Sequence, residues 1–206
     1  MKNNFDLIAP VYDTLARIVF GNTLQQAQCA FLDRISPDAK VLIIGGGNGY
    51  ILRQLLSVKP GVVVDYVEAS QQMLKRSGSK IPPGASVNFV HGTEGNIPGN
   101  VYDCIITNFF LDVFSLTELR RVVFLLKGKL ASNGQWLCTD FQSTNRWNHR
   151  ALLWLMHRFF GMVSSLEAKE LQNIDGSLQE SGLTKQEQFF WKNGLVFSAL
   201  YRHQQA

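Results

Sequence analysis

The segment Val41–Gly49 constrains the fold more than any other part of this sequence. Four apolar residues, Val41–Ile44, run directly into the glycine-rich segment Gly45–Gly49. A short run that is apolar at every position, with glycines after it, predicts a strand buried on both faces, as in a parallel sheet. The following residues, Tyr50–Val58, repeat apolar positions at helical spacing. Because glycine allows close backbone approach and a helix N-terminus offers free amides, this unit predicts a site for a nucleotide-like ligand.

The alternation of strands and helices continues along the chain. Further strands are predicted, in chain order, at Val62–Val67, Val87–His91, Tyr102–Thr107 and Gln135–Phe141. Ser70 is an expected N-cap for the helix after the second strand, and the capping box Ser115–Glu118 opens a helix to about Leu130. Such alternation predicts an α/β fold with a Rossmann-like, mostly parallel, seven-stranded sheet and helices on both faces.

The C-terminal third departs from this pattern. Two strand-like runs, Lys185–Lys192 and Leu195–His203, are joined by Asn193-Gly194. This dipeptide favours a tight turn with positive φ at both positions, so the sheet is expected to end in an antiparallel β-hairpin. The remaining helices are predicted at Phe5–Phe20 (broken at Pro10), Asn22–Ile35, Arg146–Val163 and from Ser164 to about Ser181.

Length and composition favour one globular domain. The chain has 206 residues, of which 46% are hydrophobic and 17% charged, enough for one large α/β domain. We divide the single domain 1–206 into an N-terminal helical cap (1–36), a cofactor-binding core (37–141) and a part with substrate-side helices and the hairpin (142–206). The net charge of +4 is carried by scattered basic residues, which argues against nucleic acid as a partner.

Cysteine usage and hydropathy give the expected compartment. Cys29, Cys104 and Cys138 are far apart, with neither metal-ligand spacing nor a disulfide framework, and the last two are expected to be buried. The N-terminus lacks the apolar core of a signal peptide, and no apolar stretch is long enough to span a bilayer. A cytoplasmic protein without a metal is predicted, while peripheral membrane contact and the oligomeric state stay open.

The glycine loop differs from the familiar phosphate-binding loops. Gly45, Gly47 and Gly49 do not complete the dinucleotide pattern, and the Lys-Ser/Thr ending of a P-loop is missing. Glu68 ends the second strand 19 residues after Gly49. An acidic residue there normally accepts hydrogen bonds from ribose hydroxyls, so Glu68 is the predicted ribose ligand, the alternative being a solvated strand end.

The sequence resembles the class I S-adenosylmethionine-dependent methyltransferases along nearly its whole length. The resemblance rests on Val41–Gly49, Val67–Leu74, Val87–Glu94 with Ile97-Pro98, and Tyr102–Ile106. The opening Phe5–Asp13 is similar to the start of the ubiquinone/menaquinone-type methyltransferases. The family implies methyl transfer from S-adenosylmethionine, and the aromatic-rich segments around Phe109 and Trp154 favour a small hydrophobic or aromatic acceptor molecule.

The resemblance also implies individual roles. Glycines 45, 47 and 49, with Gly46 between them, lie against the methionine part of the cofactor, and Glu68 holds the ribose. The other implied cofactor contacts are Tyr12, Ala69, Met73, Gly92, Thr93, Glu94, Asn108 and Phe109. The family usually has an acidic residue where Ile43 stands, and often Asp where Thr93 stands. The loss of the acidic residue at Ile43 supports the alternative of a non-catalytic, methyltransferase-like binding module, whereas the retained glycines, Glu68 and Met73 oppose it; a nicotinamide oxidoreductase fits less well.

Three residues are candidates for a general base. Asp112 follows the fourth strand, Asp140 ends the fifth, and His149 comes shortly after it. Ligands in such sheets bind beyond the carboxyl ends of the strands, which favours the two aspartates. The structural alternatives are a helix-cap or loop carboxylate for either aspartate and a surface position for His149. Transfer from a sulfonium mainly needs alignment and removal of water, so the base itself stays optional.

Overall fold

The computed structural model describes residues 20–79, 81–144, 146, 147, 149 and 171–204. Its strands are β1 (Lys40–Ile44), β2 (Val63–Glu68), β3 (Ser86–His91), β4 (Tyr102–Asn108), β5 (Leu130–Phe141), β6 (Leu183–Trp191) and β7 (Val196–His203). Its α-helices are α2 (Thr23–Gln28), α3 (Tyr50–Val58), α4 (Gln71–Gly78), α5 (Leu116–Lys127) and α7 (Ile174–Glu180). Short 3₁₀ turns are η1 (Leu32–Arg34), η2 (Glu94–Asn96), η3 (Leu111–Val113) and η4 (Lys192–Gly194).

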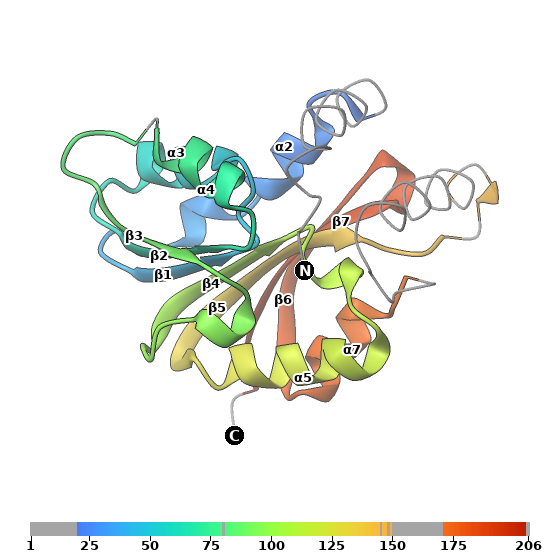
Figure 1. Ribbon diagram of the computed structural model, residues 1–206. Helices are drawn as coiled ribbons and strands as arrows, with labels where there is room; N and C mark the ends of the chain where they lie inside the picture. Colours follow the sequence, from blue (N-terminus) through green and yellow to red (C-terminus); the bar gives the residue numbers. More distant parts are fainter. Residues whose placement is uncertain (1–19, 80, 145, 148, 150–170, 205–206) are drawn as a thin grey trace.

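The seven strands form one sheet in the order β3-β2-β1-β4-β5-β7-β6. Strands β1 to β5 pair in parallel, and β7 pairs antiparallel with both β5 and β6. Helices α2, α3 and α4 lie on one side of the sheet and α5 and α7 on the other (Figure 1). The predicted fold class, with its terminal hairpin, is therefore confirmed. The strand order reverses direction between β1 and β4, and in sheets of this kind ligands bind beyond the carboxyl ends of the strands at such a switch point.

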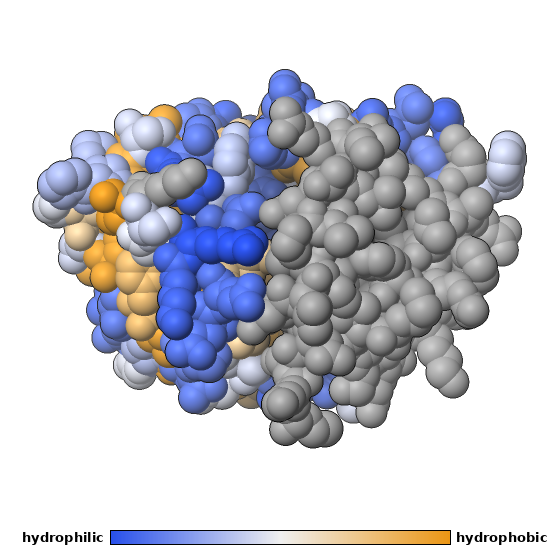
Figure 2. All heavy atoms as spheres, turned by 45° about the horizontal axis from the view of Figure 1, so that its top comes forward, coloured by the Kyte–Doolittle hydropathy of each residue, from blue (hydrophilic) through white to orange (hydrophobic). Residues whose placement is uncertain are grey.

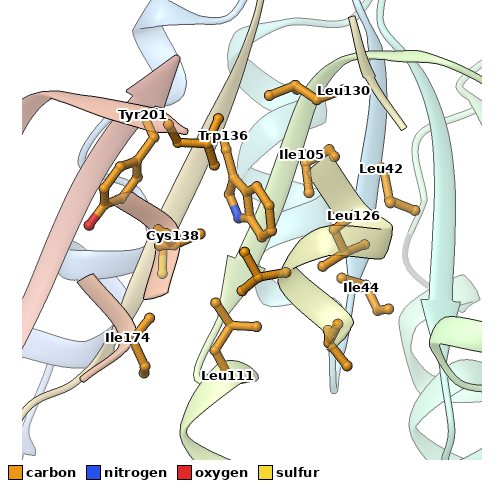
Figure 3. Packing of buried hydrophobic residues seen from close by; sticks show 14 of the residues in the cluster. Leu42, Ile44, Ile105, Leu111, Leu126, Leu130, Trp136, Cys138, Ile174 and Tyr201 are labelled. Carbon is orange, nitrogen blue, oxygen red and sulfur yellow. The ribbon is translucent and has the colours of Figure 1, made fainter. Parts of the chain in front are cut away.

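Strand β1 explains the fully apolar run of the sequence. Val41 and Ile43 pack with α3 in one hydrophobic cluster, whereas Leu42 and Ile44 pack with α5 in the other. Figure 3 shows the second cluster, in which residues of β1, β4 and β5 meet α5 and α7. Both faces of the central strand are buried, as expected for a parallel sheet covered by helices.

Two predicted helices differ from the observed ones. The helix expected over Asn22–Ile35 ends at Gln28, and η1 follows after a turn. The break lets Ala27 join the cluster around Phe141 while Phe31 and Leu32 pack beside α3. The helix that begins after Ser115 ends at Lys127, and Gly128 follows it.

The local cap signals are confirmed, and the turn signal is confirmed in part. The Ser70 side chain accepts a hydrogen bond from the Met73 amide at 3.2 Å, and the Ser115 side chain accepts one from the Glu118 amide at 3.4 Å. Asn193 and Gly194 have the expected positive φ, +54° and +89°, but Lys192 also has φ of +48°, and residues 192–195 join Trp191 to Val196 in place of the expected two-residue turn. Cys104 and Cys138 are buried, free thiols. The helices expected over Phe5–Phe20 and, for its greater part, over Arg146–Val163 lie outside the described residues.

Candidate functional site

The glycine loop connects β1 to α3 beyond the carboxyl end of β1, next to the β1/β4 switch point. Gly45, Gly47 and Gly49 all have positive φ. A Cβ on Gly45 would lie 2.6 Å from the Phe110 ring, one on Gly46 2.3 Å from the Tyr66 ring, and one on Gly49 2.6 Å from Ser77. A Cβ on Gly47 would meet nothing within 4 Å. Packing therefore requires three of the glycines, whereas Gly47 faces open space.

Glu68 and Tyr66, both on β2, hold the loop at Gly47. The Gly47 amide donates to Glu68 Oε2 at 2.8 Å, and the Tyr66 hydroxyl donates to the Gly47 carbonyl at 2.9 Å. Glu68 Oε1 accepts from the Ser70 amide at 2.8 Å. Burial, and then the nearby Glu68 carboxylate, raise the pKa of Tyr66, so its hydroxyl stays a neutral donor. The predicted ribose ligand thus also fixes the loop.

Ile43 lies in the apolar cluster beside α3, where the family usually has an acidic residue. Tyr66, directly across from Ile43 on β2, and Glu68 supply the polar contacts that hold this loop. Sequence reasoning missed the role of Tyr66. The signal was its position two residues before Glu68, which puts both side chains on the same face of β2.

The residues expected near an adenine ring gather at the ends of β2 and β3. The Gly92 amide donates to the Glu68 carbonyl at 3.0 Å, and Ala69 and Met73 flank the Ser70 cap. The Thr93 amide donates to Asn96 Oδ1 at 3.1 Å, which starts η2. The Glu94 carboxylate forms an ion pair with Arg121 at 2.6 Å. The structure therefore brings these positions together, with the Glu94 side chain engaged by α5.

The end of β4 holds a strained residue. Phe109 has φ of +52°, a conformation that is uncommon for a residue with a side chain and that is often found at functional sites. Its amide donates to the Thr139 carbonyl at 2.7 Å, and its ring lies 5.0 Å from the Phe141 ring. The neighbouring Asn108 has a buried Nδ2 atom without a hydrogen-bond partner among the described residues.

The two candidate aspartates form a buried carboxyl pair. Asp140 is fully buried; its Oδ2 accepts from the amides of Phe110 and Leu111 at 3.3 and 2.9 Å, and its Oδ1 accepts from its neighbour Phe141 at 2.9 Å. Its carboxyl group lies near that of Asp112, and the two groups affect each other's pKa. Burial raises the pKa of Asp112 to about 6, and burial together with the Asp112 charge raises that of Asp140. Asp112 Oδ1 is buried without a described partner.

Two further candidates stand apart. His149 is buried, and its Nδ1 lies 2.7 Å from Thr144 Oγ1, so its surroundings are not those of a surface histidine. The described contacts do not connect it to the aspartates. Tyr12 lies outside the described residues. The structure thus brings together the glycine loop, Glu68 and the segment after β4. Phe110, in that segment, lies against Gly45 of the loop.

Asp112→Asn is expected to stabilise the fold at pH 8 by about 3 kcal/mol relative to the original chain, because a buried carboxylate is replaced by a neutral amide. The folded pKa of about 6 lies above the ordinary 3.8. The folded state therefore binds the proton more tightly, and this contribution to stability is lost as pH rises from about 4 through 6. Urea unfolding at pH 5 and pH 8 measures it. If the difference in free energy of unfolding between Asp112→Asn and the original chain did not increase from pH 5 to pH 8, burial would not be the cause of the raised Asp112 pKa.

Among the residues that the structure describes, no helix is long and apolar enough to cross a membrane. On the face drawn in Figure 2, hydrophilic side chains dominate the coloured part, with hydrophobic ones between them in smaller groups. Exposed aromatic residues come from separate elements, Phe124 on α5 and Phe189 and Phe190 on β6. Peripheral membrane contact, which the sequence leaves open, is not tested by the described residues.

The known proteins that are similar in sequence to this chain are methyltransferases by name. No protein-family model matches the chain. The chain is 26% identical to a malonyl-[acyl-carrier protein] O-methyltransferase of Halalkalibacterium halodurans, over all of this chain and 73% of that protein. It is 30% identical to the protein of the same name from Neorickettsia risticii, over 60% of this chain and 50% of that protein. The second match thus spans about half the length of the relative.

Solved structures share the fold at lower identity. A methyltransferase solved in complex with the Haloferax volcanii activator Trm112 superposes with a TM-score of 0.73, at 15% identity and over the whole of both chains. A methyltransferase of calicheamicin biosynthesis, solved with S-adenosylhomocysteine bound, gives a TM-score of 0.65 at 15% identity, over 94% of this chain and 56% of that one. At these identities the likeness shows the fold.

Proposed function

We propose that this chain, a class I S-adenosylmethionine-dependent methyltransferase, methylates a small hydrophobic or aromatic acceptor. The observation that carries the proposal is the glycine loop at the β1/β4 switch point, where Gly47 faces open space and donates a hydrogen bond to Glu68. The curated relatives, which are methyltransferases by name, support the same reaction. When bound, the cofactor supplies a methyl group on a positively charged sulfur, which makes that carbon electrophilic.

The residues present fit this cofactor. The open space at Gly47 suits the methionine part, because a backbone without a side chain allows close approach. Each Glu68 oxygen accepts one described amide bond and retains a lone pair for a ribose hydroxyl. Ala69, Met73 and Gly92 would pack near the adenine, and the Asn108 amide would lie on the sulfonium side.

The chain's own contribution is alignment and removal of water. Phe109 and Phe110 follow β4, and their rings contact Phe141 and Phe114. Aromatic side chains in the segment after β4 favour an apolar or aromatic acceptor and would exclude water from it. Asp140 accepts bonds from three amides and so positions this segment, whereas Asp112 retains an oxygen that could take up a proton.

The relatives suggest another acceptor. They are named as malonyl-[acyl-carrier protein] O-methyltransferases, so the atom that they methylate is an oxygen. A carboxyl acceptor of that kind is the second candidate for this chain. The non-catalytic module stays the alternative from a different class, supported by Ile43 in place of the usual acidic residue. Cofactor binding separates the module from both enzyme readings.

Glu68→Ala is expected to weaken binding of S-adenosylhomocysteine at least about tenfold, because the ribose loses a carboxylate acceptor and the loop loses its tie to β2. Calorimetric titration measures the affinity. Adenosine and 2′,3′-dideoxyadenosine separate the two causes: the original chain should prefer adenosine, and the variant should lose that preference.

The outcomes are distinct. An unchanged preference for adenosine in the variant would limit Glu68 to holding the loop. Failure of the original chain to bind S-adenosylhomocysteine at millimolar concentration would overturn the methyltransferase proposal and favour the binding module. Glu187→Ala, which removes an exposed carboxylate on β6 that pairs with Arg34, serves as the control that retains affinity.

A further inference from the structure

Two buried side-chain atoms lack a hydrogen-bond partner within the part of the chain that the structure describes. They are Nδ2 of Asn108 and Oδ1 of Asp112. Buried polar atoms are nearly always satisfied, so such exceptions call for an explanation. Asn108 is the last residue of β4, and Asp112 lies in η3 directly after it. Both therefore belong to the region beyond the carboxyl end of a central strand, where ligands bind in sheets of this kind.

The two atoms offer complementary chemistry. An amide Nδ2 is a donor only, and an ionised carboxylate oxygen is an acceptor only. The Asp112 carboxyl group lies beside that of Asp140, which is itself fixed by three backbone amides. With a pKa of about 6, Asp112 is ionised at pH 7.5. The segment thus presents one fixed donor and one fixed acceptor.

We infer that Asn108 Nδ2 and Asp112 Oδ1 bind the hydroxyl group of the methyl acceptor. The Asn108 amide donates to the hydroxyl oxygen, and Asp112 accepts the hydroxyl hydrogen. This assignment rests on the proposed function and narrows its substrate class to phenols and alcohols. A hydroxyl oxygen has two lone pairs, so one accepts the bond from Asn108 and the other remains free to attack the methyl carbon.

Other acceptor groups fit this arrangement less well. A primary amine has one lone pair, and accepting a bond from Asn108 would occupy the pair needed for attack. A carboxylate has no hydrogen for Asp112, and the ionised Asp112 next to it would repel its charge. A hydroxyl therefore fits this arrangement better than the malonyl carboxyl group in the name of the curated relatives.

The proposed reaction transfers a methyl group to the acceptor oxygen and a proton to Asp112. Asp112 Oδ1 takes the hydroxyl proton while the acceptor oxygen forms its bond to the methyl carbon. The bond from that carbon to sulfur breaks, and its electron pair stays on the sulfur. The products are a methyl ether, neutral S-adenosylhomocysteine and a protonated Asp112, so the positive charge of the sulfonium is released as the proton that Asp112 passes to solvent.

Binding to the protein loaded with S-adenosylhomocysteine tests the assignment. 2-Naphthol and 2-naphthoate share one ring system and differ in the polar group, and malonyl-pantetheine represents the carboxyl acceptor of the relatives. At pH 7.5 we expect 2-naphthol to bind at least about tenfold more tightly than 2-naphthoate, because a hydrogen bond to a charged group is gained and a charge repulsion is avoided.

The variants give the assignment a second readout. Asp112→Asn and Asn108→Ala should each weaken 2-naphthol binding about tenfold, and Asp112→Asn should also narrow the preference over 2-naphthoate. Asp33→Asn, which changes an exposed carboxylate next to Arg34, should leave both affinities unchanged. S-adenosylhomocysteine affinity, measured first, reports separately on the proposed function.

Several results would overturn the hydroxyl assignment. One is equal affinity for 2-naphthol and 2-naphthoate. Another is tighter binding of 2-naphthoate or malonyl-pantetheine than of 2-naphthol. A third is that none of the three compounds binds. Retention of the 2-naphthol preference in both Asp112→Asn and Asn108→Ala would also overturn it. In each case intact binding of S-adenosylhomocysteine would leave the methyltransferase proposal standing.

Discussion

Gly47→Ala lowers the affinity for S-adenosylhomocysteine about tenfold to hundredfold, because an added methyl group occupies the space in which the methionine part of the cofactor would lie. No protein atom lies within 4 Å of that methyl position, so the loss comes from the ligand. Positive φ at Gly47 adds a stability cost of about 1–2 kcal/mol. Calorimetric titration measures the affinity and urea unfolding the stability.

Gly84→Ala is the matched control. Gly84 also has positive φ, at +84°, and open space around its Cβ position, but it lies in the connection between α4 and β3. The control should therefore lose similar stability and retain full affinity. Equal affinity of the two variants would mean that the space at Gly47 is not the cofactor site.

Asp140→Ala destabilises the fold by about 3 kcal/mol, because three backbone amides near the site lose their acceptor together. The amides of Phe110, Leu111 and Phe141 all donate to this one side chain. Asp140→Asn should cost less, since the amide oxygen remains an acceptor. The free energy of unfolding in urea, taken at pH 7, measures both variants.

Asp103→Ala provides the comparison for this loss. The Asp103 carboxylate also accepts a backbone bond, from the Lys40 amide at 2.9 Å, but in an exposed position. Water replaces the lost acceptor there, so the cost should stay at or below about 1 kcal/mol. If Asp140→Ala cost no more than Asp103→Ala, Asp140 would not be the residue that organises the segment after β4.

The sequence predicted the features that depend on neighbours along the chain. The buried strand Val41–Ile44, the cap at Ser70 and the turn at Asn193-Gly194 follow from local periodicity and backbone preference. The helix over Asn22–Ile35 was predicted too long, because the local pattern does not show that Ala27 and Phe31 pack into different clusters.

The candidate site was predictable only in part, for the same reason. The spacing from Gly49 to Glu68 identified the ribose ligand as a hypothesis, and the structure adds that Glu68 accepts the Gly47 amide. The pairing of Asp112 with Asp140 arises because β4 and β5 are neighbours, and the missing partner of Asn108 arises from burial. Both are properties of the assembled sheet.

The contact between Phe110 and Gly45 joins the two halves of the site. Gly45 belongs to the loop assigned to the cofactor, and Phe110 belongs to the segment that also carries Asp112. When binding of the cofactor or of the acceptor shifts the residue on its own side of this contact, the residue on the other side is affected too. Thermodynamic linkage then requires reciprocity: the factor by which bound cofactor tightens the acceptor equals the factor by which bound acceptor tightens the cofactor. The contact therefore gives the site a physical route to cooperative, sequential filling.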